Sequence, residues 1–227
     1  MQSESEWTAR GDALASSLAK LLLQYAPANA QRGLDIGCQR GGLMDMLARS
    51  TGVQWWGIDP ILIEQDDSLK GATIGPGRAD AIPYPDGYFD CAVFANVFEH
   101  ITPPTRQASL DEMFRVVRPG GVIAGQIPNP YFPIESHSRL PLMGFLPIRV
   151  QKKYWKLSRV PWEHDFFVVT PRTLRRYAKA AGFAVLAVNR FNYPPGAIPR
   201  SVRSVATVLR PIMSLYPWAW QFVLYRP

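Results

Sequence analysis

Three aspartates stand beside short apolar runs, in positions from which their carboxylates could bind a sugar or a cation. Asp35 precedes the glycines of the segment LDIGCQRGG at 34–42, Asp59 ends a second apolar run, and Asp80 follows a third. A carboxylate at the end of the second strand of an α/β unit can accept hydrogen bonds from ribose hydroxyls. Gly37 lacks a Cβ, so the backbone can approach a ligand closely there. The sequence therefore predicts a nucleoside-binding site.

Units of strand, turn and helix must hold these residues, and the apolar pattern predicts such units. Residues 33–36 are typical of a strand that breaks into glycines, and apolar residues from 43 to 48 follow at helical spacing. The run 53–58 predicts a second strand, which ends in Asp59. A glycine loop alone fits an ordinary strand-to-helix turn equally well. Three acidic residues in the expected order favour the ligand site.

The loop differs from a dinucleotide-binding loop in two respects. The dinucleotide pattern has glycine at its first, third and sixth places, whereas Gln39 occupies the third place here. Asp35, beside the loop, would repel a diphosphate. S-adenosylmethionine (SAM) carries an amino group and a sulfonium and no phosphate, so the same carboxylate favours it. We therefore predict SAM as the cofactor, S-adenosylhomocysteine as its product, and no metal ligands.

Five segments resemble the successive motifs of class I SAM-dependent methyltransferases, and the small-molecule branch called type 11 is the most similar. The resemblance covers about residues 30 to 126. Alternating strands and helices predict an α/β fold, a Rossmann-like, seven-stranded, mostly parallel sheet with helices on both faces. The resemblance adds an antiparallel last strand. The segments are 34–42, 57–59, 78–90, 96–100 and 110–121. In the family, the last of these segments is a helix that ends at Pro-Gly-Gly before the fifth strand, so the resemblance implies the same at 119–121.

The resemblance also implies which residues hold the cofactor. In the family, the first acid and its glycines surround the methionine part, the second acid holds the ribose, and the third acid with the next residue holds the adenine. The family usually has glycine where Gln39 stands, so this side chain either crowds the methionine pocket or reshapes the loop. The predicted cofactor-binding residues are Asp35, Gly37, Cys38, Gln39, Gly41, Asp59, Pro60, Asp80, Ala81, Asn96 and His100.

Length and element order predict one domain of 227 residues. The aromatic run 218–225 is expected to be the last strand, because Gln221 and Arg226 interrupt it too soon for a membrane anchor. We divide the chain into an N-terminal helix (1–30, with its core at 13–25), a SAM-binding core (31–126), substrate-recognition insertions (127–168 and 191–217), and the remaining core (169–190, with a helix at 170–181 and a strand at 183–189, and 218–227).

Charge is distributed unevenly along the chain. Residues 1–136 carry net charge −6 and residues 137–227 carry +13, within a total of +7. Two basic segments, 139–159 and 199–216, lie where class I methyltransferases insert substrate-recognition elements, and the second predicts a basic amphipathic helix. The excess suggests an anionic partner, although a solvated basic surface would look the same. We expect the amphipathic helix to be a lid packed on the core; contact with a membrane or a lipid-linked substrate is the alternative.

A hydroxyl acceptor must lose its proton during methyl transfer, so we looked for bases outside the cofactor motifs. Glu135 and His137 form one cluster, and Glu163, His164 and Asp165 form another. The two clusters bracket the first basic segment and resemble segments that flank the active site in related methyltransferases. Histidine titrates near neutral pH and suits proton transfer. The predicted catalytic residues are His137, His164 and Glu135.

These observations predict a SAM-dependent methyltransferase that O-methylates a small-molecule, carbohydrate or lipid-linked hydroxyl. A nucleic-acid methyltransferase is the first alternative, but Asn96-Val97-Phe98-Glu99 stands where amino-methylating enzymes usually carry Asn/Asp-Pro-Pro-aromatic. A non-catalytic SAM-binding subunit is the second. Two cysteines, no leader at 1–10 and no apolar run of about 20 residues predict a cytoplasmic protein, with peripheral membrane contact as an option.

Overall fold

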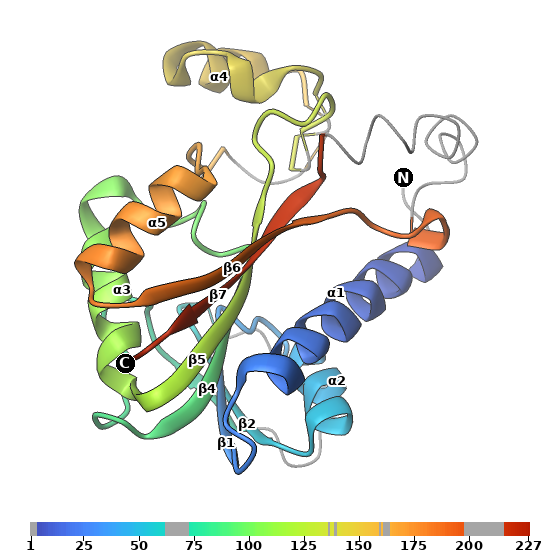
Figure 1. Cartoon of the computed structure of the whole chain (residues 1–227). Coiled ribbons are helices and arrows are strands. Elements are labelled where there is room, and N and C mark those ends of the chain that lie inside the picture. Colours follow the sequence, from blue (N-terminus) through green and yellow to red (C-terminus); the bar gives the residue numbers. More distant parts are fainter. Residues whose placement is uncertain are drawn as a thin grey trace.

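A seven-stranded sheet organises the molecule (Figure 1). The computed structural model describes residues 4–61, 73–135, 137–138, 140–158, 160, 164–197 and 216–227. The strand order is β3-β2-β1-β4-β5-β7-β6. The strands are β1 (Arg32–Ile36), β2 (Gln54–Asp59), β3 (Thr73–Pro76), β4 (Phe89–Ala95), β5 (Val117–Pro128), β6 (Ala184–Phe191) and β7 (Ala219–Tyr225).

Strand directions confirm the predicted sheet. Strands β1 to β5 pair in parallel, and β7 pairs antiparallel with both β5 and β6. In parallel pairing, β1 and β2 end together, so Asp35 lies opposite Gly57, and Asp59 ends β2 one register step beyond Ile36 and Ile58. The carboxyl ends of the central strands therefore form one edge, where open α/β sheets bind their ligands.

Two helical layers cover the sheet, as Figure 1 shows. Helices α1 and α2 pack on one face around Leu18, Met44 and Leu47, and α3 and α5 pack on the other around Met113 and Leu174. Helix α4 stands apart from both layers, at the top of Figure 1. The helices are α1 (Glu4–Tyr25), α2 (Gly42–Thr51), α3 (Arg106–Val116), α4 (Ile148–Trp155) and α5 (Pro171–Ala180), with 3-10 turns at Pro103–Thr105, Met143–Phe145 and Pro195–Ala197.

Local sequence explains where several helices begin and end. Helix α2 starts after Gly41 (φ 81°) and stops at Gly52 (φ 71°), whose N–H donates to the carbonyl of Ala48. Glycine adopts this left-handed conformation without steric cost. Helix α5 begins after Thr170, whose hydroxyl accepts a hydrogen bond from the Thr173 N–H, and Pro171 occupies its first turn.

Two elements differ from the sequence prediction. Helix α1 begins nine residues before Ala13, because the polar residues from Glu4 onward extend it. Helix α3 ends at Val116, and the Pro-Gly-Gly segment falls inside β5, where the pairing register jumps between Phe89 and Cys91 of β4. This bulge lets the strand begin earlier than the proline suggested. The predicted basic helix at 199–216 lies almost entirely outside the described residues.

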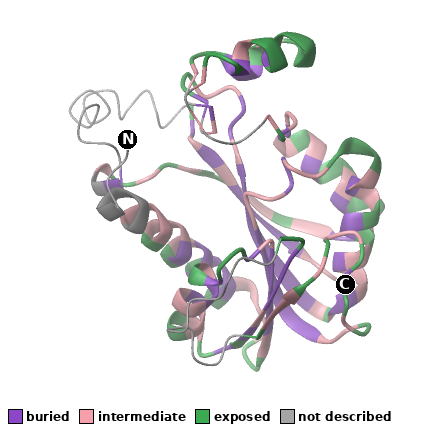
Figure 2. Cartoon of the chain, turned by 180° about the vertical axis from the view of Figure 1, so that it is seen from behind, coloured by how far each residue is buried: buried purple, intermediate pink, exposed green. Residues whose placement is uncertain are grey.

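Figure 2 shows burial concentrated in the sheet and on the inner helix faces. Strand β4 is buried along six successive residues, as expected for a central parallel strand covered on both faces. The C-terminal strand β7 is mostly buried between β5 and β6, which confirms the prediction that its aromatic run belongs to the sheet. Among the described residues, no helix combines the length and apolar character needed to cross a bilayer.

Candidate active site at the carboxyl edge of the sheet

A cavity of about 240 Å³ opens at the carboxyl edge of the sheet. Four predicted cofactor-binding residues line it, namely Gly37 after β1, Pro60 after β2, Asp80 in the loop after β3, and His100 after β4. Further lining residues that the sequence motifs did not single out are Ile101, Thr102, Thr105 and Ser109, at the start of α3 and just before it. The cavity thus draws on four successive strand ends, which is the arrangement expected of a nucleoside site.

The loop after β1 is fastened to the end of β2. The backbone N–H groups of Gly37 and Cys38 both donate to the carbonyl of Ile58, at 2.8 and 3.1 Å. Gly37 has φ 80°, and a Cβ at this position would run into the side chain of Val97. A side chain there would therefore disturb both the turn and the cavity wall. The Gly41 N–H closes the loop on the carbonyl of Cys38 at 2.8 Å.

Gln39, which stands where the family usually has glycine, lies in the loop after β1. It adopts φ 49°, a conformation that the usual glycine would reach without strain. Its N–H donates to Asp59 Oδ2 at 3.0 Å, while the Ile61 N–H donates to Asp59 Oδ1 at 2.9 Å. The Gln39 side chain is exposed and is not among the residues that line the cavity. The Gln39 side chain therefore does not crowd the pocket in this structure.

Asp35 is a buried acid beside the glycine loop, and one of its carboxylate oxygens has no hydrogen-bond partner among the described residues. It is 2% exposed, and its Oδ2 accepts no hydrogen bond from the described residues. Burial, reinforced by the charge of Asp59, raises the pKa of Asp35 from 3.8 to about 7. A buried carboxylate with this environment is stabilised by a positively charged ligand. The cavity, the close-approach loop and this acid fit SAM, whose amino group and sulfonium are cationic.

The other predicted cofactor residues lie around this centre. Asp80 forms a bidentate ion pair with Arg78, at 2.9 and 3.1 Å, and this hydrogen bonding lowers the pKa of its carboxyl. Ala81 follows it but does not line the cavity. Asn96 has φ 56°, and its Oδ1 accepts a hydrogen bond from Gln126 Nε2 at 3.1 Å, on the β5 side. The cofactor roles of these residues stay predictions.

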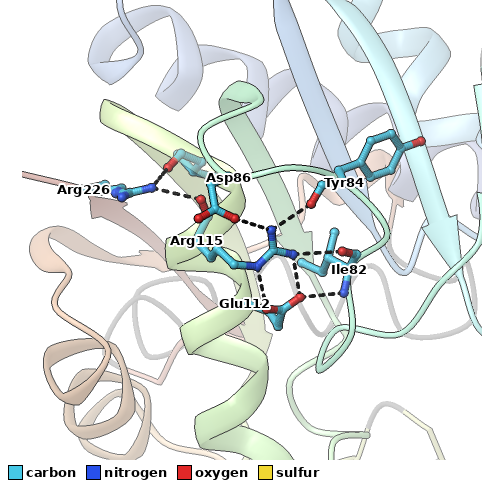
Figure 3. Close-up of polar contacts among 7 residues, drawn as sticks. Ile82, Tyr84, Asp86, Glu112, Arg115 and Arg226 are labelled. Carbon is cyan, nitrogen blue, oxygen red and sulfur yellow. Dashed lines mark hydrogen bonds and ion pairs between the residues drawn. The ribbon is translucent and has the colours of Figure 1, made fainter.

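Arg115 fixes the loop that carries Asp80 to helix α3, as Figure 3 shows. Its guanidinium donates to the carbonyls of Ile82 and Tyr84, and to the carboxylates of Asp86 and Glu112, at 2.7 to 3.0 Å. Glu112 also accepts the Ile82 N–H at 2.9 Å. A single arginine therefore uses its whole donor fork to hold the segment that the family resemblance assigns to adenine.

A second polar group, which we call the histidine cluster, joins residues far apart in the sequence. His137 Nδ1 and Glu135 Oε1 are hydrogen-bonded at 2.6 Å, and His137 Nε2 lies 3.9 Å from Glu99 Oε1. The His100 ring packs edge-on against the His137 ring, with centroids 5.1 Å apart, and its Nδ1 lies 3.1 Å from Asp165 Oδ2. The cluster comprises Glu99, His100, Glu135, His137 and Asp165.

The carboxylates of this cluster have opposite environments. Burial raises the pKa of Glu99, which is 2% exposed and accepts no hydrogen bond from the described residues. Burial would also raise the pKa of Glu135, but His137 and the N–H groups of His137 and Ser138 outweigh it and lower this pKa to about 2. Burial lowers the pKa of His100, but the carboxylates of Asp165 and Glu99 together outweigh it, so the pKa rises overall. Glu135 is therefore a firmly ionised partner of His137.

The structure brings His137 and Glu135 together but holds His164 elsewhere. His164 Nε2 lies 3.2 Å from Gln151 Oε1 of α4, and its ring stacks on Phe166. Phe166 also stacks on His137. Sequence reasoning did not select Glu99; an acid followed by a histidine shortly after a central strand was the available signal. Glu163 lies outside the described residues.

Together, the sheet order, the glycine loop and the acids at the strand ends define a class I SAM-dependent methyltransferase. The model of a family described as a methyltransferase domain matches residues 7–188. The chain belongs to this family.

Curated relatives include two enzymes named ubiquinone/menaquinone biosynthesis C-methyltransferase. The enzyme of Serratia proteamaculans is 27% identical over 190 residues, covering 74% of this chain and 71% of that protein. The enzyme of Hahella chejuensis is 34% identical over 89 residues, covering 36% of this chain and 35% of that protein. The latter match thus spans about a third of its relative.

Solved structures with the same fold include two methyltransferases. A SAM-dependent methyltransferase from Archaeoglobus fulgidus superposes with a TM-score of 0.56 at 17% identity, covering 94% of this chain and 93% of that one. Phosphoethanolamine N-methyltransferase 2 of Haemonchus contortus, solved with S-adenosylhomocysteine, gives a TM-score of 0.59 at 16% identity and covers 93% and 52%. These likenesses establish the fold; they leave the methyl acceptor to be argued from the site.

Proposed function

We propose that the protein transfers the methyl group of SAM to a hydroxyl of an amphipathic small molecule, with His137 as the general base. The proposal is carried by the hydrogen bond between the His137 ring and Glu135 and by the contact of that ring with His100, which lines the cavity. Bound SAM supplies an electrophilic methyl group on a sulfonium. As the new O–CH₃ bond forms and the S–CH₃ bond breaks, the hydroxyl proton passes to His137.

Glu135 acts on this reaction through His137. Its carboxylate accepts the N–H groups of His137 and Ser138 and the Ser138 hydroxyl, at 2.6 to 3.0 Å, in addition to binding the His137 ring. A carboxylate held this way orients the imidazole and stabilises the imidazolium that forms on proton uptake. We therefore assign Glu135 a positioning role, and His164 the role of an anchor between α4 and Phe166.

The segment around α4 supports an amphipathic acceptor. Its exposed apolar side chains lie among exposed cations, and its inner residues Met143 and Trp155 pack with Phe166, which stacks on His137. The segment that carries this apolar, positively charged surface thus packs, through Phe166, against the proposed base. It suits a lipid-linked or otherwise anionic acceptor. The exposed apolar residues are Leu142, Phe145, Ile148, Val150 and Leu157, and the cations are Arg149, Lys152, Lys153 and Lys156.

Similarity to C-methyltransferases favours a second acceptor, a carbon made nucleophilic by loss of a neighbouring hydroxyl proton. The same base would serve that reaction. Product analysis distinguishes the two, because an O-methyl ether and a C-methyl product differ in their NMR spectra.

Substitution of His137 tests the base directly. We expect His137→Ala to lower the turnover number by a factor of about 10² to 10⁴ in a screen of phenolic and lipid-linked alcohols. The SAM affinity, measured by calorimetry, should stay unchanged. His164→Ala is the matched control and should retain most of the turnover. Equal turnover in the wild type and His137→Ala would refute the assignment, and SAM binding without turnover on any acceptor would favour a non-catalytic subunit.

A further inference from the structure

We propose that Glu99, His100 and His137 form a binding site for a divalent transition-metal ion at the edge of the cofactor cavity. One potential ligand atom from each residue lies within 4.8 Å of the other two. Two imidazoles and one carboxylate are a common donor set for Zn²⁺ in catalytic sites, where the fourth position stays open. The same set also suits Fe²⁺, Mn²⁺ and Co²⁺.

Glu99 supplies the independent observation. Its carboxylate is 2% exposed, and neither oxygen accepts a hydrogen bond from the described residues. Burying an acid in this way is costly unless a positive charge compensates it. Its Oε1 lies 3.9 Å from His137 Nε2, close to the distance of about 3.4 Å between two ligands of tetrahedral Zn²⁺. A shift of about 0.5 Å would bring both atoms onto one ion.

Each of the two histidines has a carboxylate beside its Nδ1 atom. Glu135 binds His137 Nδ1 at 2.6 Å, and Asp165 lies 3.1 Å from His100 Nδ1. Metal-ligating histidines commonly make such a contact, which fixes the ring and leaves the other nitrogen to face the ion. The three surrounding carboxylates, of Glu99, Glu135 and Asp165, also give the cluster the negative charge that a divalent cation would neutralise.

The site belongs to the cavity, because His100 lines both. Metal binding itself does not depend on the proposed methyl transfer; only the chemical role of the bound ion does. A divalent cation lowers the pKa of a hydroxyl that it binds. With the cation in place, His137 would be its ligand, and an acceptor hydroxyl bound to the cation would release its proton to water instead of to the imidazole.

Calorimetry on untagged protein, stripped with a chelator and titrated with ZnCl₂ and then MnCl₂ without SAM or acceptor, tests the site. We expect one Zn²⁺ per chain with a Kd of about 1 µM or tighter. Glu99→Gln and His137→Ala should each weaken Zn²⁺ binding by about 100-fold or more. His164→Ala, the third histidine of the chain, is the matched control and should bind as the wild type does.

SAM titration of each variant verifies that it is folded, because the cofactor loop lies on β1 and β2. The proposal is overturned if the wild type binds no Zn²⁺, if Glu99→Gln binds it as tightly, or if His164→Ala loses it. If His137→Ala loses turnover and the wild type binds no Zn²⁺, the metal site is refuted and the general-base proposal stands. If the wild type binds Zn²⁺ and His137→Ala loses the ion but keeps full turnover, the metal site stands and the general-base proposal is wrong.

Discussion

Replacing Asp35 by Asn should make the cofactor-free protein more stable at alkaline pH and make it bind SAM more weakly. The wild-type carboxyl is fully buried, and its pKa rises from 3.8 to about 7 because of burial and of Asp59. Between these two values the folded state holds a proton that the unfolded state releases. The free energy of unfolding therefore falls as the pH rises through this window.

The pKa values set the size of this effect. Each pKa unit corresponds to about 1.4 kcal/mol, so ionised Asp35 costs the folded state about 4 kcal/mol at pH values above 7. Most of this cost accrues between about pH 5 and pH 8, where we expect a loss of about 3 kcal/mol from this residue. Asparagine does not titrate, so Asp35→Asn should lose that part of the pH dependence. Any hydrogen bond that the amide gains or loses changes the free energy of unfolding equally at both pH values. It therefore cancels when the two pH values are compared.

Urea unfolding of both proteins without cofactor, at about pH 5 and about pH 8, measures the difference. We expect the stability advantage of Asp35→Asn over the wild type to grow by about 2–3 kcal/mol between the two pH values, and its SAM affinity to fall by about tenfold or more. Parallel pH dependences in the two proteins would refute the argument, because Asp35 would then ionise in the folded state as it does in the unfolded one.

Further substitutions test two other parts of the molecule, the Arg115 network and the surface of α4. Arg115→Met should lower the free energy of unfolding by about 2–4 kcal/mol and weaken SAM binding, because Glu112 and the loop carbonyls of Ile82 and Tyr84 lose their donors. Urea unfolding measures the first effect and SAM calorimetry the second. Unchanged SAM binding would show that this network does not support the cofactor site. The pair Phe145→Ser and Leu157→Glu should weaken sedimentation with anionic vesicles by about tenfold, since both side chains are exposed. Leu23→Glu, at an exposed position of α1, is its control, and equal sedimentation of both variants with the wild type would argue against a lipid-facing α4.

The succession of strands and helices along the chain and the position of the cofactor loop were predictable because each depends on local sequence. Gly37 and Gly41 mark a turn that has few other solutions, and the buried run of β4 could only be a central strand. The bulge after α3 was missed because its cause is the pairing of β5 with β4, which no local pattern encodes. A proline there predicted a later start for the strand.

The histidine cluster shows what local sequence leaves open. Glu135 and His137 are neighbours, so their pairing was predictable, but Glu99 is 38 residues before His137 and meets it only in the fold. Burial decides the chemistry of Glu99, and burial follows from tertiary packing. His164 is a similar case: its residue type suggested catalysis, and its contacts with Gln151 and Phe166 follow from tertiary packing that the local sequence does not show.

Asp35 and Glu99 share one physical feature, a buried carboxylate whose pKa is raised by desolvation and which has an oxygen without a partner among the described residues. They belong to neighbouring strands: Asp35 lies in β1 and pairs with Val93 of β4, and Glu99 comes shortly after β4 ends. Each costs the empty protein stability that a positive ligand can restore. We therefore expect saturation with both SAM and Zn²⁺ to stabilise the protein against urea by more than either ligand does alone, because each proposed ligand would compensate one of these buried carboxylates.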